Sequence, residues 1–410
     1  MKVLALSAYY EPEIAASMYI PVNLYADMTA AGIHVTVIAP LPTRGVSEET
    51  RRQYAQRKVE TKFDGRLTIH RFWMFREGKH PLWRALRYLL LNIVFIIKAL
   101  SLRADVIFVQ STPPTQGAMA AVISRLKGIP FVYNIQDVFP DSLVAAGLSN
   151  QGSLLWRIGC ALADYSYQGA SKIIVISDTL RSNLLARGVA EDKIEVIENW
   201  VDTYSVSPIP KRTNFLYDAF GLARSKFYCA YCGNIGLSQN LDLLLDVAES
   251  LAEHDHIGFI VVGDGVYKDT FVEEIARRRL AKLHVFPFQP YDRISEVFSI
   301  GDVGLVISKP GVGSSSVPSK TWSIMAASRP VVASFDDTAE LKSIIESQGC
   351  GVWARAGDMG ALRDAILSLS TRPELCSSMG ENALRYVREN LSRDIATKKY
   401  IGVLTAVGNG

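Results

Sequence analysis

The chain has 410 residues, of which 49% are hydrophobic and 21% charged, so we expect two globular domains. A formal net charge of +3 is too small to indicate a nucleic-acid-binding protein. Five scattered cysteines argue against a disulfide framework and favour a reducing compartment. Cys229 and Cys232 lie within an apolar run, which favours buried strand residues over a redox or zinc site.

Apolar runs of strand length alternate with helical patterns along the first half of the chain. This alternation is typical of parallel sheets that helices cover on both faces. The first run is too short for a secretory signal, and no run approaches the roughly 20 apolar residues of a membrane-spanning helix. The strands expected here are Val3–Ser7, His34–Ile38, Leu67–Phe72, Val106–Gln110, Phe131–Asn134, Ile173–Ile176 and Glu195–Ile197.

Polar residues follow two of these strands, and ligands of such sheets bind beyond the carboxyl ends of the strands. Residues 8–17 carry Glu11 and Glu13, which could bind acceptor hydroxyls, although simple exposure is the default for loop glutamates. Gln136 and Asp137 follow the strand Phe131–Asn134. We expect Asp137 to face an interdomain cleft and to contact the donor sugar or the acceptor.

The segment Arg76–Arg103 combines six basic residues and one acid, Glu77, with a broad apolar face. Such a composition suits a helix that lies in the headgroup region of an anionic bilayer. The alternative is a core helix over the first sheet, and part of the apolar face must serve that purpose.

The alternation of strand and helix patterns is interrupted at Ser205–Arg212, a polar stretch with two prolines that predicts a linker. We therefore expect an α/β fold with two doubly wound Rossmann-like domains, at 1–204 and 213–385. The helical stretch 386–410 follows and packs either on its own domain or back on the first. The strands expected in the second half are Phe227–Cys232, Gly258–Val262, Leu283–Phe286, Gly304–Ile307, Val331–Ala333 and Gly351–Trp353.

Two strand-to-helix loops of the second half suit an anion. In the first, Gly233 and Gly236 permit close backbone approach, and the helix that follows favours a negative charge at its N-terminus. A tight turn without a ligand is the alternative there. The second loop, Ser308–Lys320, contains glycines, serines and a helix-opening proline, with Lys309 and Lys320 at its ends. We expect this second loop to bind a diphosphate, and the alternative is a solvated linker. A third loop, Phe288–Pro290, offers groups to a base.

Several segments in order along nearly the whole chain carry a family resemblance: Ser111–Ala121, Ile135–Leu143, Val196–Asp202, Cys232–Gly236, Val261–Gly265 and Ser316–Ser334. In these the chain resembles the retaining glycosyltransferases of family 4, which have the GT-B architecture of two Rossmann-like domains facing a cleft. It is most similar to the bacterial branch that builds surface polysaccharide, including fucosaminyltransferase-like O-antigen enzymes.

The resemblance implies transfer of a hexosyl-type sugar, with retention, from a nucleoside-diphosphate sugar to a glycan or polyprenyl-diphosphate-linked acceptor. Uridine diphosphate is favoured over guanosine diphosphate, and neither a metal nor another cofactor is expected. Together with the cysteine usage and the basic, apolar segment 76–103, the resemblance leads us to expect a cytoplasmic protein that lies peripherally on the inner face of the membrane.

The predicted catalytic residues are Asp137 and Lys320. The acceptor set is Glu13, Ala16, Ser17 and Gln136. The donor set is Gly233, Asn234, Gly236, Gln239, Phe288, Gly313, Ser314, Ser315, Ser316, Val317, Pro318, Ser319 and Ser323.

The chain departs from the family pattern at the donor loop. Ser315 and Ser323 stand where the family has two glutamates, and Asn234 and Gln239 stand where it commonly has an arginine and a lysine. We therefore infer that Lys320, backbone donors and the helix dipole carry the diphosphate charge. Two other classes stay open: a non-catalytic nucleotide-sugar-binding module, and a nucleotide-sugar epimerase of the same architecture.

Overall fold

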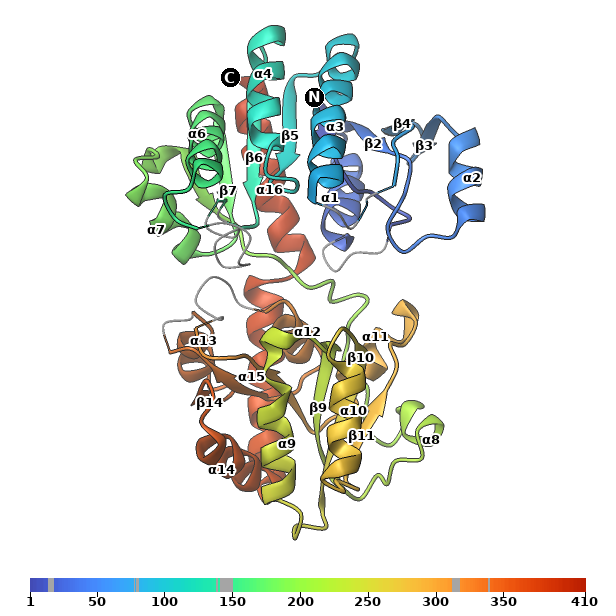
Figure 1. Cartoon of the computed structure of the whole chain (residues 1–410), viewed down its shortest axis with the longest axis vertical. Helices are drawn as coiled ribbons and strands as arrows, with labels where there is room; N and C mark the ends of the chain where they lie inside the picture. Colours follow the sequence, from blue (N-terminus) through green and yellow to red (C-terminus); the bar gives the residue numbers. More distant parts are fainter. Residues whose placement is uncertain are drawn as a thin grey trace. The chain divides into compact units, whose positions relative to one another are not determined.

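The computed structural model describes residues 1–13, 18–76, 78, 81–137, 139–140, 150–311, 318–337 and 340–410. The chain divides into two compact units, which comprise 1–198 with 396–410, and 199–395. Each unit is a largely parallel sheet covered by helices (Figure 1), so the predicted α/β class with two doubly wound units is confirmed.

The described part of the first unit contains an eight-stranded sheet in the order β3-β4-β2-β1-β5-β6-β7-β8. All the predicted strands form and pair in parallel. Val59–Lys62, which the sequence analysis did not predict, adds an antiparallel edge strand of mostly exposed residues. The strands are β1 (Lys2–Leu6), β2 (His34–Pro40), β3 (Val59–Lys62), β4 (Leu67–Phe72), β5 (Val106–Gln110), β6 (Phe131–Ile135), β7 (Lys172–Val175) and β8 (Ile194–Val196).

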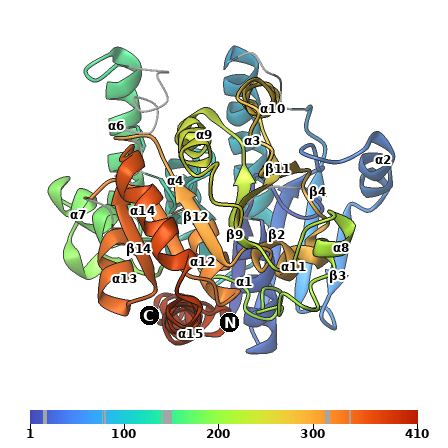
Figure 2. The same cartoon turned by 90° about the horizontal axis from the view of Figure 1, so that it is seen from below.

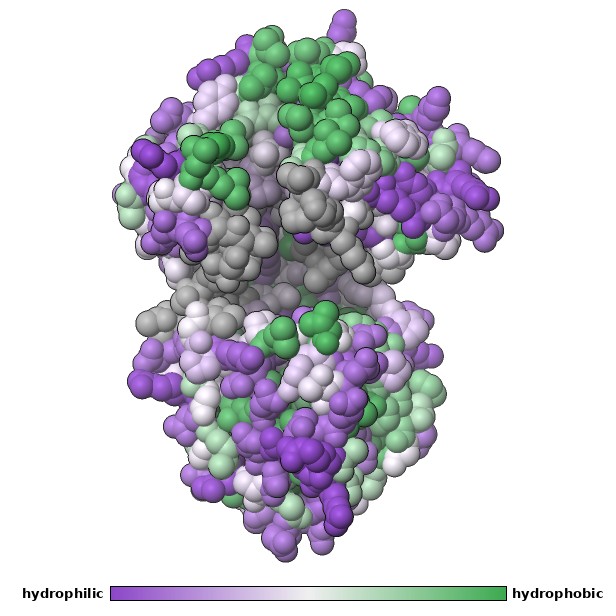
Figure 3. Space-filling model, in the orientation of Figure 1, coloured by the Kyte–Doolittle hydropathy of each residue, from purple (hydrophilic) through white to green (hydrophobic). Residues whose placement is uncertain are grey.

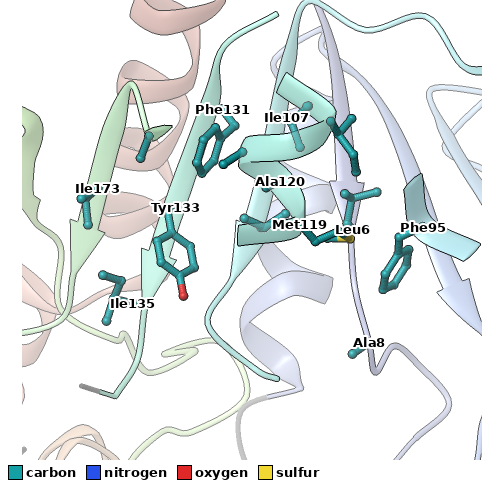
Figure 4. Packing of buried hydrophobic residues seen from close by; sticks show 14 of the residues in the cluster. Leu6, Ala8, Phe95, Ile107, Met119, Ala120, Phe131, Tyr133, Ile135 and Ile173 are labelled. Carbon is teal, nitrogen blue, oxygen red and sulfur yellow. The ribbon is translucent and has the colours of Figure 1, made fainter. Parts of the chain in front are cut away.

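Helices cover both faces of this first sheet. On one face, Phe95 and Met119 gather with Leu6 of β1 in a continuous apolar core (Figure 4). On the other, the ring of Phe108 meets Tyr25 and Tyr400 edge-on, with centroids 6.4 and 6.1 Å apart. The helical elements are α1 (Tyr19–Ala30), α2 (Glu48–Gln56), α3 (Pro81–Ser101), α4 (Gln116–Lys127), α6 (Leu154–Gly169), α7 (Asp178–Ala186), η1 (Glu191–Lys193) and α16 (Arg393–Asn409).

The C-terminal helix α16 belongs to the first unit from Ala396 onward. Its Tyr400 is fully buried, and its hydroxyl accepts a hydrogen bond from Nδ2 of Asn134 on β6. Burying a tyrosine ring while its hydroxyl keeps a partner stabilises the contact without leaving a polar atom unsatisfied. The end of the chain is thereby held against the first sheet.

The described part of the second unit contains a six-stranded parallel sheet in the order β11-β10-β9-β12-β13-β14. Cys229 and Cys232 are buried free thiols within β9, as expected. The strands are β9 (Phe227–Asn234), β10 (Ile257–Asp264), β11 (Leu283–Phe286), β12 (Val303–Ile307), β13 (Val331–Phe335) and β14 (Gly351–Arg355).

Two helical layers cover the second sheet, with α9 and α10 on one side and α12 and α15 on the other (Figure 2). Capping by Asp358, whose Oδ1 accepts from Ala361 N at 2.9 Å, marks one helix start. The helical elements are α8 (Leu216–Ala219), η2 (Leu237–Gln239), α9 (Leu241–Ser250), α10 (Lys268–Arg277), η3 (Tyr291–Arg293), α11 (Ile294–Phe298), α12 (Lys320–Ala326), α13 (Glu340–Gln348), α14 (Met359–Ser370) and α15 (Pro373–Asn390).

The stretch 205–212, which the sequence predicts as a linker, lies within the second unit. Ser207 N donates to Ser295 Oγ, and Ile209 N donates to Ser299 Oγ, each at 3.0 Å. These bonds tie the backbone of the stretch to α11 and to the residue after it. Backbone N–H groups can therefore hold a segment with two prolines against its own unit, and the sequence of the segment gives no sign of these bonds.

Candidate functional site

The strand order of the second unit reverses between β9 and β12, because β10 and β11 lie on one side and β13 and β14 on the other. In open parallel sheets, ligands bind at such a switch point, beyond the carboxyl ends of the strands. The loops after β9 and β12 are the two that the sequence analysis selected for the diphosphate. The candidate site of this unit is therefore at this switch point.

Lys320, the first residue of α12, places its ammonium group against β9. Its Nζ lies 3.7 Å from the centroid of the Tyr231 ring, a cation–π distance. The residue as a whole is half-buried, but Nζ is buried and has no hydrogen-bond partner among the described residues. This desolvation lowers the pKa of Lys320 to about 7, and the nearby Cys232 offsets part of the shift. An anion at this point would restore the favourable charged state.

The backbone after β9 approaches this ammonium group closely. Gly233 has φ +139°, a conformation that side chains disfavour, and a Cβ there would lie 3.8 Å from Lys320 Nζ. The Tyr231 hydroxyl donates to the carbonyl of Asn234 at 2.6 Å, which holds the turn in place. A Cβ on Gly236 would lie 2.6 Å from both Asn234 Nδ2 and Gln239 Oε1. The structure thus places Gly233 of the predicted loop beside Lys320, and Gly236 beside Asn234 and Gln239.

Three further polar atoms in the segments that follow β9 and β12 are buried without a hydrogen-bond partner in the described part of the chain. They are Gln239 Oε1 in η2, Ser308 Oγ after β12 and Thr321 Oγ1 in α12. Lys309 N donates to Ser238 O at 2.9 Å, so the loops after β9 and β12 are joined. Each unsatisfied buried polar atom costs about 1–3 kcal/mol. A ligand with its own donors and acceptors would relieve this cost.

Ser308 and Thr321 were not in the predicted donor set. The sequence shows Ser308 as a polar residue at the end of an apolar strand and Thr321 as a hydroxyl in the first turn of an apolar helix. Neither feature tells whether the hydroxyl has a hydrogen-bond partner, because that depends on neighbours from other elements. The two residues therefore join the candidate site from the structure.

The remaining predicted donor residues are placed less centrally or lie outside the described residues. Pro318 and Ser323 are half-buried, and Ser319 is exposed. Phe288 follows β11 and is 58% exposed. Since β10 separates β11 from β9, the strand that precedes Phe288 lies about 10 Å across the sheet from β9. The predictions for Gly313, Ser314, Ser315, Ser316 and Val317 concern residues outside those described.

In the first unit, Glu13 is 4% exposed, so the default of an exposed loop glutamate is wrong for this residue. Its Oε1 accepts from Thr43 N, Thr43 Oγ1 and Arg44 N at 2.7, 3.0 and 3.0 Å. Its Oε2 accepts from Tyr10 N at 3.1 Å. The carboxylate thereby fastens the loop after β1 to the loop after β2, and an acceptor contact stays a prediction. The predictions for Ala16 and Ser17 concern residues outside those described.

Gln136 and Asp137 follow β6, as predicted. Gln136 N donates to Ser111 Oγ at 3.0 Å, and its Nε2 donates to Asn134 Oδ1 at 2.5 Å. Asp137 lies at the surface, yet neighbouring protein removes enough water to raise the pKa of its carboxyl. Gln136 is thus part of a network with β5 and β6, whereas Asp137 is the more accessible group. Their roles on the substrates remain predictions.

Comparisons with known proteins identify the family of the chain. Residues 19–200 match the family described as "Glycosyl transferase 4-like domain", and residues 217–386 match "Glycosyl transferases group 1". A Pseudomonas aeruginosa protein named as a glycosyltransferase, WbjE, is 26% identical over 79% of this chain and 81% of its own length. An Escherichia coli (strain K12) protein named as a colanic acid biosynthesis glycosyl transferase, WcaI, is 25% identical over 66% of this chain and 68% of its own.

Solved structures share the fold. The crystal structure of Anabaena HepE in complex with UDP has a TM-score of 0.74 at 15% identity, covering 99% of this chain and 100% of that one. The structure of WaaG, described as a glycosyltransferase involved in lipopolysaccharide biosynthesis, has a TM-score of 0.71 at 15% identity. That comparison covers 98% of this chain and 99% of WaaG. At such identities the likeness supports the GT-B fold alone.

Proposed function

Because the chain belongs to the glycosyltransferases that join a 4-like domain to a group 1 domain, we propose that it uses a uridine-diphosphate sugar. The sugar passes with retention to a glycan or lipid-linked acceptor in surface-polysaccharide synthesis. The names of WbjE and WcaI support the polysaccharide assignment, and the UDP complex of HepE supports the base.

The observation that carries this proposal is the buried ammonium of Lys320 at the switch point of the second sheet, which has no hydrogen-bond partner among the described residues. Cleavage of the bond from sugar to diphosphate develops negative charge on the leaving oxygen. A preorganised cation and hydrogen-bond donors aimed at that charge favour the transition state over the ground state. Lys320 supplies the cation, and the hydroxyls of Ser308 and Thr321, which have no hydrogen-bond partner among the described residues, supply donors.

Retention follows in this scheme if the leaving diphosphate accepts the proton of the incoming hydroxyl on the same face of the sugar. The new bond then forms between the acceptor oxygen and the anomeric carbon as the old bond to the diphosphate oxygen breaks. The ammonium of Lys320 and the donors around it stabilise the diphosphate throughout. No separate nucleophile is required from the chain.

A peripheral membrane position fits the surface of the first unit. In the described part of the chain, no helix is both long and apolar enough to cross a bilayer. The outer face of α3 nevertheless exposes Trp83, Leu86, Leu89, Leu90, Ile93, Ile97 and Leu100. Hydrophobic residues gather there and over α4 (Figure 3). Such a face, with Arg84 and Lys98 on the same helix, supports contact with an anionic bilayer.

Donor hydrolysis tests the proposed activity. The purified chain is incubated with uridine- and guanosine-diphosphate sugars, and release of the nucleoside diphosphate is followed with time. We expect slow release of uridine diphosphate from one sugar donor, and stabilisation of the protein against heat by uridine diphosphate. Binding without any release across the donors and acceptors would instead indicate a non-catalytic module.

A further inference from the structure

We propose that Asn134 and Tyr400 are positioning residues, which orient the amide of Gln136 so that its oxygen accepts a hydrogen bond from a hydroxyl of the acceptor sugar. This hydroxyl is a neighbour of the one that reacts, so the proton transfer to the leaving diphosphate is unchanged. The proposal rests on the proposed glycosyltransferase function, because it concerns the acceptor of that enzyme. The sequence analysis assigned no functional role to Asn134 or Tyr400.

Asn134 is an amide side chain in the interior of the first sheet. All five residues of β6 are buried, and Asn134 is 0% exposed. Its neighbours Tyr133 and Ile135 belong to the apolar core on one face of the sheet (Figure 4). Because successive side chains of a strand alternate, Asn134 points to the opposite face, where α16 lies. Parallel strands covered on both faces are usually apolar runs, so packing alone does not explain an asparagine here.

Two directed hydrogen bonds join a buried hydroxyl to Gln136. Asn134 Nδ2 donates to the hydroxyl of Tyr400, and Asn134 Oδ1 accepts from Gln136 Nε2 at 2.5 Å. Burial raises the pKa of Tyr400, so its hydroxyl stays protonated and neutral. The amide nitrogen of Gln136 is thereby held at Asn134, and the amide oxygen is the end that lies away from it. We call the chain Tyr400–Asn134–Gln136 the amide relay.

The backbone at the end of the amide relay is also held. Gln136 N donates to Ser111 Oγ at 3.0 Å, and Ser111 N donates to Asn134 O at 2.8 Å. These bonds join the ends of β5 and β6 at the carboxyl edge of the sheet, where ligands of such folds bind. Gln136 is half-buried, and Asp137 beside it is exposed. The relay therefore connects the interior to an accessible amide, which loses little conformational freedom when a ligand binds.

The chemistry of this edge favours a hydroxyl group as the ligand. An amide oxygen is a neutral hydrogen-bond acceptor, so its partner must supply a donor. A sugar hydroxyl does so. A phosphate would instead bring further acceptor oxygens to the amide oxygen and to the carboxyl of Asp137.

Two reactions of the full-length protein separate positioning from stability. With one uridine-diphosphate sugar, transfer to p-nitrophenyl hexosides is compared with hydrolysis by water, which has no neighbouring hydroxyl to be placed. In Tyr400→Phe we expect kcat/KM for the hexoside to fall about fivefold, and hydrolysis to stay within about twofold of the wild type. The matched control is Tyr25→Phe. Tyr25 is also buried against Phe108, but its hydroxyl lies 3.3 Å from Ser7 Oγ, outside the relay, so both rates should stay as in the wild type.

Two further variants test whether the relay acts through Gln136. Gln136→Ala should show the same loss of transfer, and adding Tyr400→Phe to it should lower transfer no further. The double variant Asn134→Val with Tyr400→Phe removes both buried polar partners together. Its stability to urea should therefore stay close to that of the wild type, while transfer still falls about fivefold.

Several outcomes overturn the proposal: unchanged transfer in Tyr400→Phe, an equal loss of transfer and hydrolysis, an additive loss in the Gln136→Ala background, or a wild type that hydrolyses the donor without glycosylating any hexoside. The absence of donor hydrolysis in the wild type counts against the proposed function instead. Hydrogen exchange of the segment 134–137 then still decides the positioning role. Exchange should be faster in Tyr400→Phe than in Tyr25→Phe, and equal exchange overturns that role.

Discussion

At the carboxyl edges of both sheets, polar residues follow apolar strands. The polar side chains compared here differ in whether they have hydrogen-bond partners. After β1, the Glu13 carboxylate accepts four hydrogen bonds from its own unit. After β9 and β12, Lys320 Nζ, Gln239 Oε1 and Ser308 Oγ are buried without partners in the described part of the chain. Satisfied polar groups hold loops in place, whereas orphaned ones leave binding capacity for a ligand. Hydrogen-bond satisfaction therefore separates the structural edge residue Glu13 from the candidate binding residues of the second unit.

The largest expected effect is on catalysis, from removal of the orphaned charge. Lys320→Met keeps an apolar stem over Tyr231 but removes the ammonium. We expect turnover at saturating donor to fall about a hundredfold, or about 3 kcal/mol of activation free energy. Lys342→Met is the matched control, because Lys342 also lies over an aromatic ring, 4.2 Å from that of Trp353. Unchanged turnover in Lys320→Met would remove this lysine from the mechanism.

The next largest effect is on stability, at the satisfied edge. Glu13→Ala leaves the backbone donors of Tyr10, Thr43 and Arg44 without their acceptor, so we expect the free energy of unfolding to fall by about 3 kcal/mol. Urea unfolding measures the change. Glu11→Ala removes an exposed pair with Lys62 and should cost at most about 1 kcal/mol. An unaltered stability of Glu13→Ala, with lost acceptor use, would reverse the assignment of Glu13 to structure.

The pH dependence of binding reports the charge of Lys320 directly. Burial lowers its pKa to about 7 in the free protein, whereas a bound diphosphate favours the protonated form. Above pH 7 the free lysine is neutral and takes up a proton on binding, so affinity for uridine diphosphate should fall by up to about tenfold per pH unit. Calorimetry between about pH 7.5 and 9, where the phosphates are fully ionised, measures this slope. In Lys320→Met the slope should vanish, and a slope that persists there belongs to another group.

The smallest expected effect contrasts two buried serines. Ser308→Ala removes an unsatisfied hydroxyl, so the free energy of unfolding should stay unchanged or rise by up to about 1 kcal/mol, while uridine diphosphate binds about fivefold more weakly. Ser299 is equally buried, but its Oγ accepts from Ile209 N at 3.0 Å. Ser299→Ala should therefore lose about 1 kcal/mol of stability and keep its affinity. Equal changes in stability and affinity for the two variants would show that the missing hydrogen-bond partner of Ser308 among the described residues has no effect on either property.

Periodicity alone identified the second unit's strands, because a buried parallel strand is a continuous apolar run whichever neighbours it pairs with. Local composition selected the two loops of the switch point, since glycines and a helix-opening proline act within a few residues of sequence. The strand Val59–Lys62 was missed because its polar, mostly exposed residues resemble a loop. Its strand character comes only from pairing with β4.

The sequence by itself selected Lys320 as the candidate lysine, but it did not determine the environment of that side chain. Lys320 stands out as a basic residue between a glycine- and serine-rich loop and an apolar helix. Its ring contact with Tyr231, the burial of its ammonium group and its lowered pKa depend on residues about 90 positions earlier, which only the parallel pairing of the sheet brings near. The same holds for Glu13, whose exposure was misjudged because its partners belong to the loop after another strand. Local sequence determines which polar groups a loop carries. The tertiary structure determines which of these groups are left without a hydrogen-bond partner and can bind a ligand, because burial and partners come from distant elements.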